Sequence, residues 1–329
     1  MACHDIIAIG ASAGGLEALS QLVNQLPPDL AASLFVVQHT SPESPGFLAT
    51  ILDGRGPLPA IMPADGTRIE KGMIYVAPPD RHLLLKKGHM HLTRGPHENR
   101  SRPAIDVLFR SAAVTYGPRV IGLILSGFLS DGVVGLMAIK RCGGVIIVQD
   151  PTDAKYPALP QNALQAMQAD YVLPVAEIGA VITRLAGEPA LERVSVPGDI
   201  LAEARFAERN SGPAVGAPPL GELTSLSCPL CHGPLQFLQN DNTPHYRCHT
   251  GHSFTPESLE SSQEEAVERA LWSALRLMEE RVVLLSNMAD YELERGRSLA
   301  ARRFQERAEE MKTHLRYLRE LIEKVIAMI

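Results

Sequence analysis

The stretch IIAIGASAGGLEALSQLVNQL, residues 6–26, contains the pattern that decides the fold. The apolar run Ile6–Ile9 predicts a short buried strand, and the apolar residues after Gly15 recur at helical spacing. A glycine-rich turn joins the two directly. Because units of this kind build parallel sheets covered by helices, residues 6–26 predict the start of an α/β domain.

The same alternation of strands and helices continues to about residue 186. Further strands are expected at Leu34–Gln38, Met73–Ala77, Val120–Leu125, Val145–Val148 and Tyr171–Leu173, and helices near 43–53, 104–116, 132–140, 161–168 and 176–186. Several strands are apolar throughout, as expected when helices cover both faces of a parallel sheet. The segment 81–94, centred on Lys86-Lys87-Gly88, predicts a β-hairpin. The predicted fold is a doubly wound, mostly parallel, Rossmann-like sheet with a β-hairpin extension.

Ser12 is the candidate nucleophile. It stands in the turn G-A-S-A-G, residues 10–14, between the first predicted strand and its helix. Unpaired N–H groups at the start of a helix stabilise developing negative charge. A dinucleotide-binding turn would need Gly at this position and an acidic residue after the second strand, but that strand ends in Gln38-His39. The turn therefore favours a nucleophile, and no cofactor is expected for catalysis.

His39 and Asp131 follow two other predicted strands and should lie at the same edge of the sheet as Ser12. Taken singly, His39 is an ordinary loop residue and Asp131 an ordinary helix N-cap. Together, a histidine that takes the serine proton and a carboxylate that orients the imidazole predict a Ser-His-Asp triad. The order Ser, His, Asp along the chain differs from that of α/β-hydrolases, so that fold is not expected.

Five separated blocks carry a resemblance to a known family. They are IAIGASAGGLEAL (7–19), VVQH (36–39), ADGTRIEKGMIYVAPPDRHL (64–83), SRPAIDVLF (101–109) and LILSGFLSDGVVGL (123–136). Over residues 5–186 the chain resembles the catalytic domain of chemotaxis protein-glutamate methylesterases, the CheB type. The resemblance implies hydrolysis of γ-glutamyl methyl esters, and deamidation of certain glutamines, on the cytoplasmic helices of chemoreceptors. The family's Ser, His and Asp correspond to Ser12, His39 and Asp131.

The chain departs from the family's usual pattern around the triad. Ala13 replaces the Thr that usually follows the nucleophile, and Phe128-Leu129 replace a Met-Gly pair before the Asp. These changes affect the oxyanion geometry or the shape of the pocket. The family usually carries a receiver domain ahead of the first strand, which this chain lacks room for, so we do not expect regulation by phosphorylation of this polypeptide. His82 is expected to line or brace the cleft.

Two hypotheses from different classes follow for the function. The first is a serine esterase acting on glutamyl methyl esters of a methylated chemoreceptor or related signalling protein. The second is a catalytically impaired signalling module that binds receptors or regulators through its carboxyl-terminal parts. Reaction of Ser12 with a small fluorophosphonate discriminates them, and a binding screen tests a third idea, a nucleotide-binding fold.

Cysteines and histidines between residues 226 and 256 predict a zinc-ribbon-like module. Cys228 and Cys231 form a C-x-x-C pair, and Cys248 with His252 forms the second pair of a tetrahedral zinc site. His249, His245 and His232 are rival fourth ligands. A module this small buries little core, so a structural zinc ion is the expected stabiliser. A redox C-x-x-C would need a thioredoxin-like fold around it, and the sequence shows none.

The remaining sequence divides the chain into four expected parts. Residues 1–190 form the catalytic domain, 191–225 a linker, 226–256 the Cys/His module, and 257–329 a helical tail. In the tail, apolar residues repeat at heptad spacing on both sides of Gly296. An antiparallel hairpin folded at Gly296 and a coiled-coil dimer both fit, and either leaves a surface for self-association or for a partner helix.

Composition excludes several function classes. With a formal net charge of -6 and no basic cluster, the chain is not expected to bind nucleic acid. Its 5 cysteines, an odd number, argue against a disulfide framework. No signal peptide and no apolar run of about 20 residues is present, so we expect a cytoplasmic protein without membrane insertion.

Overall fold

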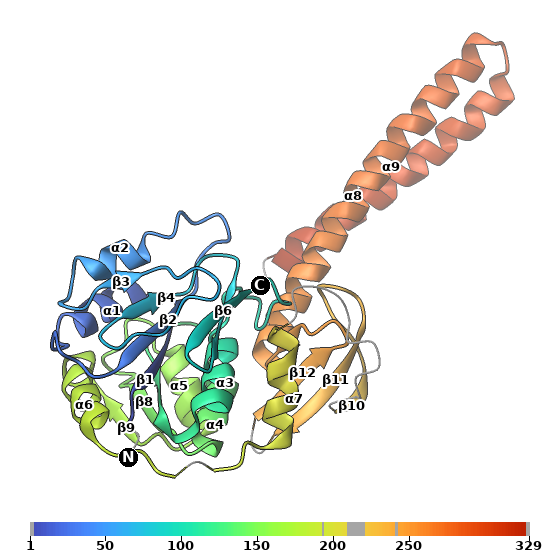
Figure 1. Cartoon of the computed structure of the whole chain (residues 1–329). Coiled ribbons are helices and arrows are strands. Elements are labelled where there is room, and N and C mark those ends of the chain that lie inside the picture. The colour runs from blue at the N-terminus through green and yellow to red at the C-terminus, as the bar shows by residue number, and fades with distance from the viewer. Residues whose placement is uncertain (1–2, 193, 209–220, 241–242, 327–329) are drawn as a thin grey trace. The chain divides into compact units, whose positions relative to one another are not determined.

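The structure is a computed structural model that describes residues 3–192, 194–208, 221–240 and 243–326. The chain divides into two compact units, Met1–Leu259 and Glu260–Ile329. The first contains a seven-stranded sheet in the order β3-β4-β2-β1-β7-β8-β9, in which all neighbouring strands run parallel (Figure 1). The predicted doubly wound α/β fold is confirmed.

Element bounds agree closely with the sequence pattern. The strands of the sheet are β1 (Ile6–Ala11), β2 (Ser33–Gln38), β3 (Ala60–Ile61), β4 (Ile74–Val76), β7 (Val120–Ile124), β8 (Val145–Gln149) and β9 (Tyr171–Leu173). Its helices are α1 (Gly15–Val23), α2 (Leu48–Asp53), α3 (Ile105–Tyr116), α4 (Val133–Arg141), α5 (Ala158–Ala166) and α6 (Val175–Gly187). A short 3-10 helix, η1 (Gly117–Arg119), leads from α3 into β7. Helix α2 begins later than predicted because Pro45 and Gly46, the latter at φ 75°, turn the chain ahead of it.

Two hydrophobic layers explain why the strands are apolar throughout. Alternate residues of β1 point to opposite faces, with Ile6 and Ala8 in one core and Ile7 and Ile9 in the other. Helices α3, α4 and α5 cover the first face, and α1, α2 and α6 cover the second. Every strand position in the centre of the sheet is therefore buried.

The order of the strands sets where a ligand can bind. The chain builds the sheet outward from β1 through β2 in one direction and from β7 through β8 in the other. In open α/β sheets the crevice at such a reversal, outside the carboxyl ends of the strands, is the usual ligand site. The residues after β1, β2 and β7 meet at this edge.

Two additions flank the sheet. The predicted hairpin is present as β5 (His82–Lys86) and β6 (His89–Thr93), which pair antiparallel. Helix α7 (Gly198–Ala207) lies within 191–225, where the sequence predicts a linker. Ile200, Ala204 and Ala207 are buried on one side of α7, and this apolar face explains why the segment folds. Of the stretch predicted to be flexible, 212–220 lies outside the described residues.

The Cys/His module is a four-stranded antiparallel sheet. Its strands are β10 (Glu222–Ser227), β11 (Pro234–Asn240), β12 (Thr243–Cys248) and β13 (Ser253–Phe254), in that order. The core of this module is small: Leu235, Phe254 and Leu259 are buried with Cys228 and Cys248. So little apolar surface is a weak stabiliser by itself.

A buried cluster of charges joins this module to the α/β sheet. Arg247 on β12 lies 3.1 Å from Glu98 and 3.4 Å from Glu203 of α7. Arg110 on α3 donates to the same Glu98 carboxylate at 2.6 Å. All four side chains are nearly inaccessible to solvent. Since removal of one member leaves an unpaired buried charge, the cluster fixes the module against the domain.

The second unit is a helical hairpin. Helix α8 (Pro256–Glu294) and helix α9 (Ser298–Ile326) are joined at Gly296, whose φ of 73° suits a glycine (Figure 1). Leu275 of α8 packs against Leu315 and Ile322 of α9. Of the two arrangements that the heptad pattern allows, the chain adopts the hairpin. No helix in the described ranges combines the length and apolar character that crossing a membrane requires.

The charge cluster predicts a loss of stability in acid. Burial would raise the pKa of Glu98, but Arg110 and Arg247 hold it at about 2, below its ordinary 4.5. Between these values the unfolded chain binds more protons than the folded one, so the free energy of unfolding should fall as pH drops from 4.5 towards 2. Glu98 alone contributes roughly 3 kcal/mol to this change.

Denaturant unfolding followed by circular dichroism across this pH range measures the effect. Glu98→Gln should lower stability at pH 7 and flatten the acid slope, whereas Glu70→Gln, at an exposed side chain, should change neither. An unaltered slope in Glu98→Gln would contradict the assignment.

Candidate active site

Ser12 and His39 lie side by side at the edge of the sheet. Ser12 follows β1 and precedes α1, and His39 follows β2. The Ser12 hydroxyl is 3.1 Å from His39 Nδ1. Gln38 holds the turn in place, because its side-chain amide donates to the Ser12 carbonyl at 2.6 Å. The hydroxyl is therefore presented to the imidazole by a hydrogen-bonded turn.

Asp131 completes the line of hydrogen bonds. His39 Nε2 donates to Asp131 Oδ2 at 2.7 Å. Because a carboxylate oxygen only accepts, Nε2 carries the proton and Nδ1 is left with a lone pair facing the Ser12 hydroxyl. The exposed fraction is 19% for the His39 side chain and 2% for that of Asp131. The imidazole is thus open to a ligand on one side and fixed from within on the other.

The amino terminus of α3 holds the Asp131 carboxylate. Ile105 N donates to Oδ2 at 2.7 Å, and Asp106 N donates to Oδ1 at 3.2 Å. The Asn99 amide adds a third donor to Oδ1 at 3.1 Å. These groups and the positive end of the helix dipole stabilise a buried negative charge.

Asp106 is a second buried carboxyl group beside Asp131. Burial, and then the Asp131 charge, raise the pKa of Asp106 well above its usual value. Its Oδ1 accepts from Gly132 N at 3.0 Å and from Gly135 N at 2.6 Å, at the start of α4. Asp106 therefore links the starts of α3 and α4, on either side of Asp131.

His82 braces the segment that leads into α3. It is fully buried, and burial lowers its pKa, which favours the neutral imidazole. Its Nε2 donates to the Pro96 carbonyl at 2.9 Å, and its Nδ1 accepts from Ala104 N at 3.2 Å. Since Ala104 precedes the first residue of α3, His82 supports the helix end that binds Asp131.

The loop before Asp131 carries two of the three departures from the family pattern, Phe128 and Leu129. Gly127 lies so close to Ser12 that an added Cβ would be 2.8 Å from the Ser12 Cβ. Its N–H donates to the Tyr156 carbonyl at 3.0 Å, so that group is already engaged. Phe128 is half exposed against the Tyr156 ring, and Leu129 adopts a left-handed φ of 59°. Phe128 and Leu129 thus lie in the loop that leads to Asp131, and the three hydrogen-bonded side chains remain in contact.

An apolar hollow of about 260 Å³ opens beside His39. Its lining includes Leu16, Phe47, Ile51, Met62 and Pro79. Phe47 is 65% exposed, and Leu16 and Met62 are 41% and 43% exposed. Exposed apolar groups around a reactive centre are typical of a site that receives another molecule.

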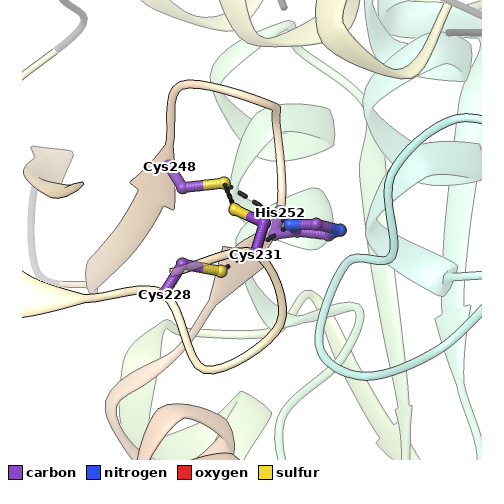
Figure 2. A group of neighbouring side chains, drawn as sticks. All are labelled: Cys228, Cys231, Cys248 and His252. Carbon is purple, nitrogen blue, oxygen red and sulfur yellow. Dashed lines mark hydrogen bonds between the residues drawn. The ribbon is translucent and has the colours of Figure 1, made fainter. Parts of the chain in front are cut away.

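The four candidate metal ligands come together in the Cys/His module, as Figure 2 shows. Cys231 Sγ lies 3.6 Å from Cys248 Sγ. His252 Nδ1 lies 3.6 Å from Cys228 Sγ and 3.5 Å from Cys248 Sγ. All four ligand atoms fall within 4.8 Å of one another. The rival His245 is instead buried against Glu203 at 3.3 Å.

Comparisons with known proteins identify the family. Residues 7–182 match the model for CheB methylesterase, so the chain belongs to the CheB methylesterase family. A "putative protein-glutamate methylesterase/protein-glutamine glutaminase" of Leptospira interrogans serovar copenhageni is 38% identical over 183 residues, covering 55% of this chain and 95% of that protein. "Protein-glutamate methylesterase/protein-glutamine glutaminase 2" of Methanosarcina mazei is 35% identical over 190 residues, and the chain covers 52% of its length.

A solved structure supports the same assignment. The crystal structure of the Thermotoga maritima CheB methylesterase catalytic domain is 33% identical, with a TM-score of 0.54. The similarity covers 98% of that chain and 55% of this one. The recognised family and the predicted fold are therefore both confirmed.

Sequence reasoning left two residues of the site unassigned. Asp106 lies in the block SRPAIDVLF, but nothing in its spacing reveals that it neighbours Asp131. Asn99 precedes that block in a polar run, H-E-N-R, which reads as an ordinary loop. Its φ of 47° is a conformation that Asn tolerates better than most residues. Their roles depend on contacts between distant segments.

The close approach of Gly127 to Ser12 yields a second prediction. Gly127→Ala should push the serine away from His39 and slow its reaction with a fluorophosphonate by about 10–100-fold, since small misplacements of reacting groups are costly. Labelling followed by mass spectrometry gives the rate. Gly187→Ala, where an added Cβ meets nothing within 4 Å, is the matched control. Equal labelling rates for both variants would refute the prediction.

Proposed function

We propose that the chain is a serine esterase that hydrolyses glutamyl methyl esters, and deamidates glutamine as a second activity, on chemoreceptor-type proteins. One observation carries the proposal. Ser12, His39 and Asp131 form a continuous line of hydrogen bonds of 3.1 and 2.7 Å at the edge of the sheet. Membership of the CheB methylesterase family and the names of its relatives support the substrate class.

The proposed reaction has two steps. The Ser12 proton passes to His39 Nδ1 while Oγ attacks the ester carbonyl, and the methoxy group leaves as methanol with that proton. Water then gives a proton to His39 and attacks the acyl-serine, which frees the glutamate carboxylate and restores the serine. With a glutamine substrate the leaving group is ammonia.

Asp131 acts on the imidazole in this scheme. Its Oδ2 fixes the Nε2–H orientation of His39 and stabilises the imidazolium that forms in each step. The two backbone donors at the start of α3 keep the carboxylate in place while the charge on His39 changes. The proposal treats Asp131 as an electrostatic and orienting group that does not itself take the proton.

Loss of the nucleophile tests the proposal directly. Ser12→Ala should abolish release of methanol from a methyl-labelled receptor and abolish fluorophosphonate labelling, with unchanged circular dichroism. Ser273→Ala, on the exposed side of α8, should leave both unchanged. A wild-type chain that neither labels nor releases methanol would instead favour the impaired signalling module, and full activity of Ser12→Ala would exclude this serine as the nucleophile.

We further propose that Cys228, Cys231, Cys248 and His252 hold a structural zinc ion. Three thiols and one imidazole are a donor set that zinc prefers. With Zn–S bonds of about 2.3 Å, the sulfur–sulfur edge of a tetrahedral site is about 3.8 Å, close to the 3.6 Å between Cys231 and Cys248. A bound ion would crosslink the turns of a module that has little core.

Metal content tests this second proposal. The dialysed chain should contain about one zinc ion per molecule, as expected of a closed structural site. Cys228→Ser should lose it and lower the thermal midpoint, whereas Cys3→Ser, outside the cluster, should retain it. Full zinc content in Cys228→Ser would contradict the assignment of this ligand.

We propose a cytoplasmic setting and a helical partner for the tail. The relatives' names, protein-glutamate methylesterase/protein-glutamine glutaminase, support glutamyl methyl esters of a protein as the substrate. On α8, Leu277, Val283 and Leu284 are more than half exposed although α9 packs alongside. This apolar face supports self-association or docking of another amphipathic helix.

A further inference from the structure

The loop that carries Asn99 is paired with the Cys/His module through its backbone. Asn99 N donates to the Ser253 carbonyl at 2.8 Å, and Ser253 N donates to the His97 carbonyl at 3.4 Å. Ser253 directly follows His252, one of the four clustered ligands. The loop thus pairs with β13 through a single parallel bridge between Glu98 and Ser253, one residue from the candidate metal site.

The Asn99 side chain continues this link. Its Oδ1 accepts from Thr255 N at 3.0 Å and from Ser258 Oγ at 3.1 Å. Both partners belong to the segment that leaves the module and enters α8. Asn99 is 6% exposed, so these bonds are made out of contact with bulk water.

The other end of the same amide contacts the proposed catalytic carboxylate. Asn99 Nδ2 donates to Asp131 Oδ1 at 3.1 Å and to Asp106 Oδ2 at 2.8 Å. The two ends are not interchangeable, because the carboxylates need donors and Thr255 N needs an acceptor. One side chain therefore spans the distance from the module to Asp131.

A second contact runs in parallel. Ser130, next to Asp131, has its hydroxyl 2.6 Å from that of Thr255 and 3.3 Å from Glu257 Oε2. The buried Arg247–Glu98 pair anchors the residue before Asn99 to the same module. Ser130, next to Asp131, and Glu98, next to Asn99, are thus both held by contacts with the module as well.

We propose that Asn99 is a positioning residue that couples the Cys/His module to Asp131, so that a folded, metal-bound module sets the catalytic rate of the esterase. The proposal rests on the esterase function argued above. When the module is undocked, Oδ1 of Asn99 loses both donors and its backbone loses Ser253. The amide that restrains Asp131 Oδ1 is then free to turn.

The expected effect is on turnover and not on substrate binding. Ile105 N and Asp106 N still hold Asp131 when Asn99 is lost, so part of the activity should remain. Asn99 does not line the apolar hollow beside His39. A change confined to kcat is therefore the signature of positioning, since loss of ground-state binding would raise KM.

Two substitutions at Asn99, made in the full chain, test the roles of the amide oxygen and the amide nitrogen separately. Asn99→Asp keeps acceptors for Thr255 and Ser258 but removes the donor to Asp131. Asn99→Gly removes both ends and keeps a residue that accepts the left-handed φ. Asn287→Ala, at an exposed position on α8, is the matched control.

Both variants should lower kcat for methyl-ester hydrolysis by about tenfold or more, as loss of an outer hydrogen-bond partner does in other sites. KM should stay within about twofold. Asn99→Asp should keep the zinc content of the parent chain. Unchanged kcat in Asn99→Gly, or a loss of activity accompanied by an equal rise in KM, would overturn the proposal.

Proton NMR provides a readout that does not need turnover. The low-field signal of the His39 Nε2 proton, hydrogen-bonded to Asp131, should be present in the parent chain and in Asn287→Ala and should shift or broaden in both Asn99 variants. This signal tests the coupling even if the parent chain hydrolyses no ester. Absence of ester hydrolysis in the parent chain would refute the proposed function but not the coupling. An identical signal in parent and Asn99→Gly would refute the coupling.

Removal of the metal completes the experiment. Cys228→Ser, or chelation of the parent chain, should lower kcat and alter the imidazole signal as Asn99→Gly does. In the Asn99→Gly background, chelation should add less than about twofold, because coupled residues are non-additive. Full additivity of the two changes would show that the module affects the site by another route and would overturn the proposal.

Discussion

The site depends on one buried carboxylate at the start of a helix. Asp131 is almost fully buried, and such a charge is tolerated only where donors surround it. The amino terminus of α3 supplies two backbone N–H groups, and Asn99 and His39 supply two more. Burial, and then the Asp131 charge, raise the pKa of the neighbouring Asp106, as expected where two buried carboxyl groups lie close together. The orientation of His39, and through it the position of the Ser12 hydroxyl, follows from where Asp131 is held.

Small residues bring the supporting elements close enough for this to work. An added Cβ at Gly10 would lie 2.3 Å from Ile105 Cγ2, so glycine on β1 lets the start of α3 pack directly on the central strand. Gly127 likewise lets the loop before Asp131 pack directly against Ser12. The parallel sheet places the ends of β1, β2 and β7 at one edge, and these glycines set how near the helices approach it. As a result, His39 and Asp131 lie within hydrogen-bond distance although they are 92 positions apart in the sequence.

The Cys/His module is integrated with the catalytic domain through polar contacts. Its own core is small, while its Arg247 is buried between Glu98 and Glu203 of the α/β part. Buried ion pairs stabilise less than their number suggests, but they allow few alternative arrangements once both partners are desolvated. The module's last strand and the residues after it meet the loop that carries Asn99. The module that carries the four clustered Cys and His side chains and the hydrogen-bonded line of Ser12, His39 and Asp131 thus share one network of buried polar groups.

Sequence alone predicted most of the elements and which polar residues gather at two places. Apolar runs separated by helical periodicity predicted the parallel sheet, and the serine, histidine and aspartate after three strands predicted where reactive groups gather. The Cys and His spacing predicted the four clustered ligands. The sequence did not decide whether the tail forms a hairpin or a coiled-coil dimer. It also predicted a linker at Gly198–Ala207, although that segment folds as α7. Local patterns report which residues are buried along an element, whereas the partners of Asn99, Asp106 and Arg247 come from segments up to 159 residues away. Only the tertiary structure decides such contacts, because they depend on how whole elements pack.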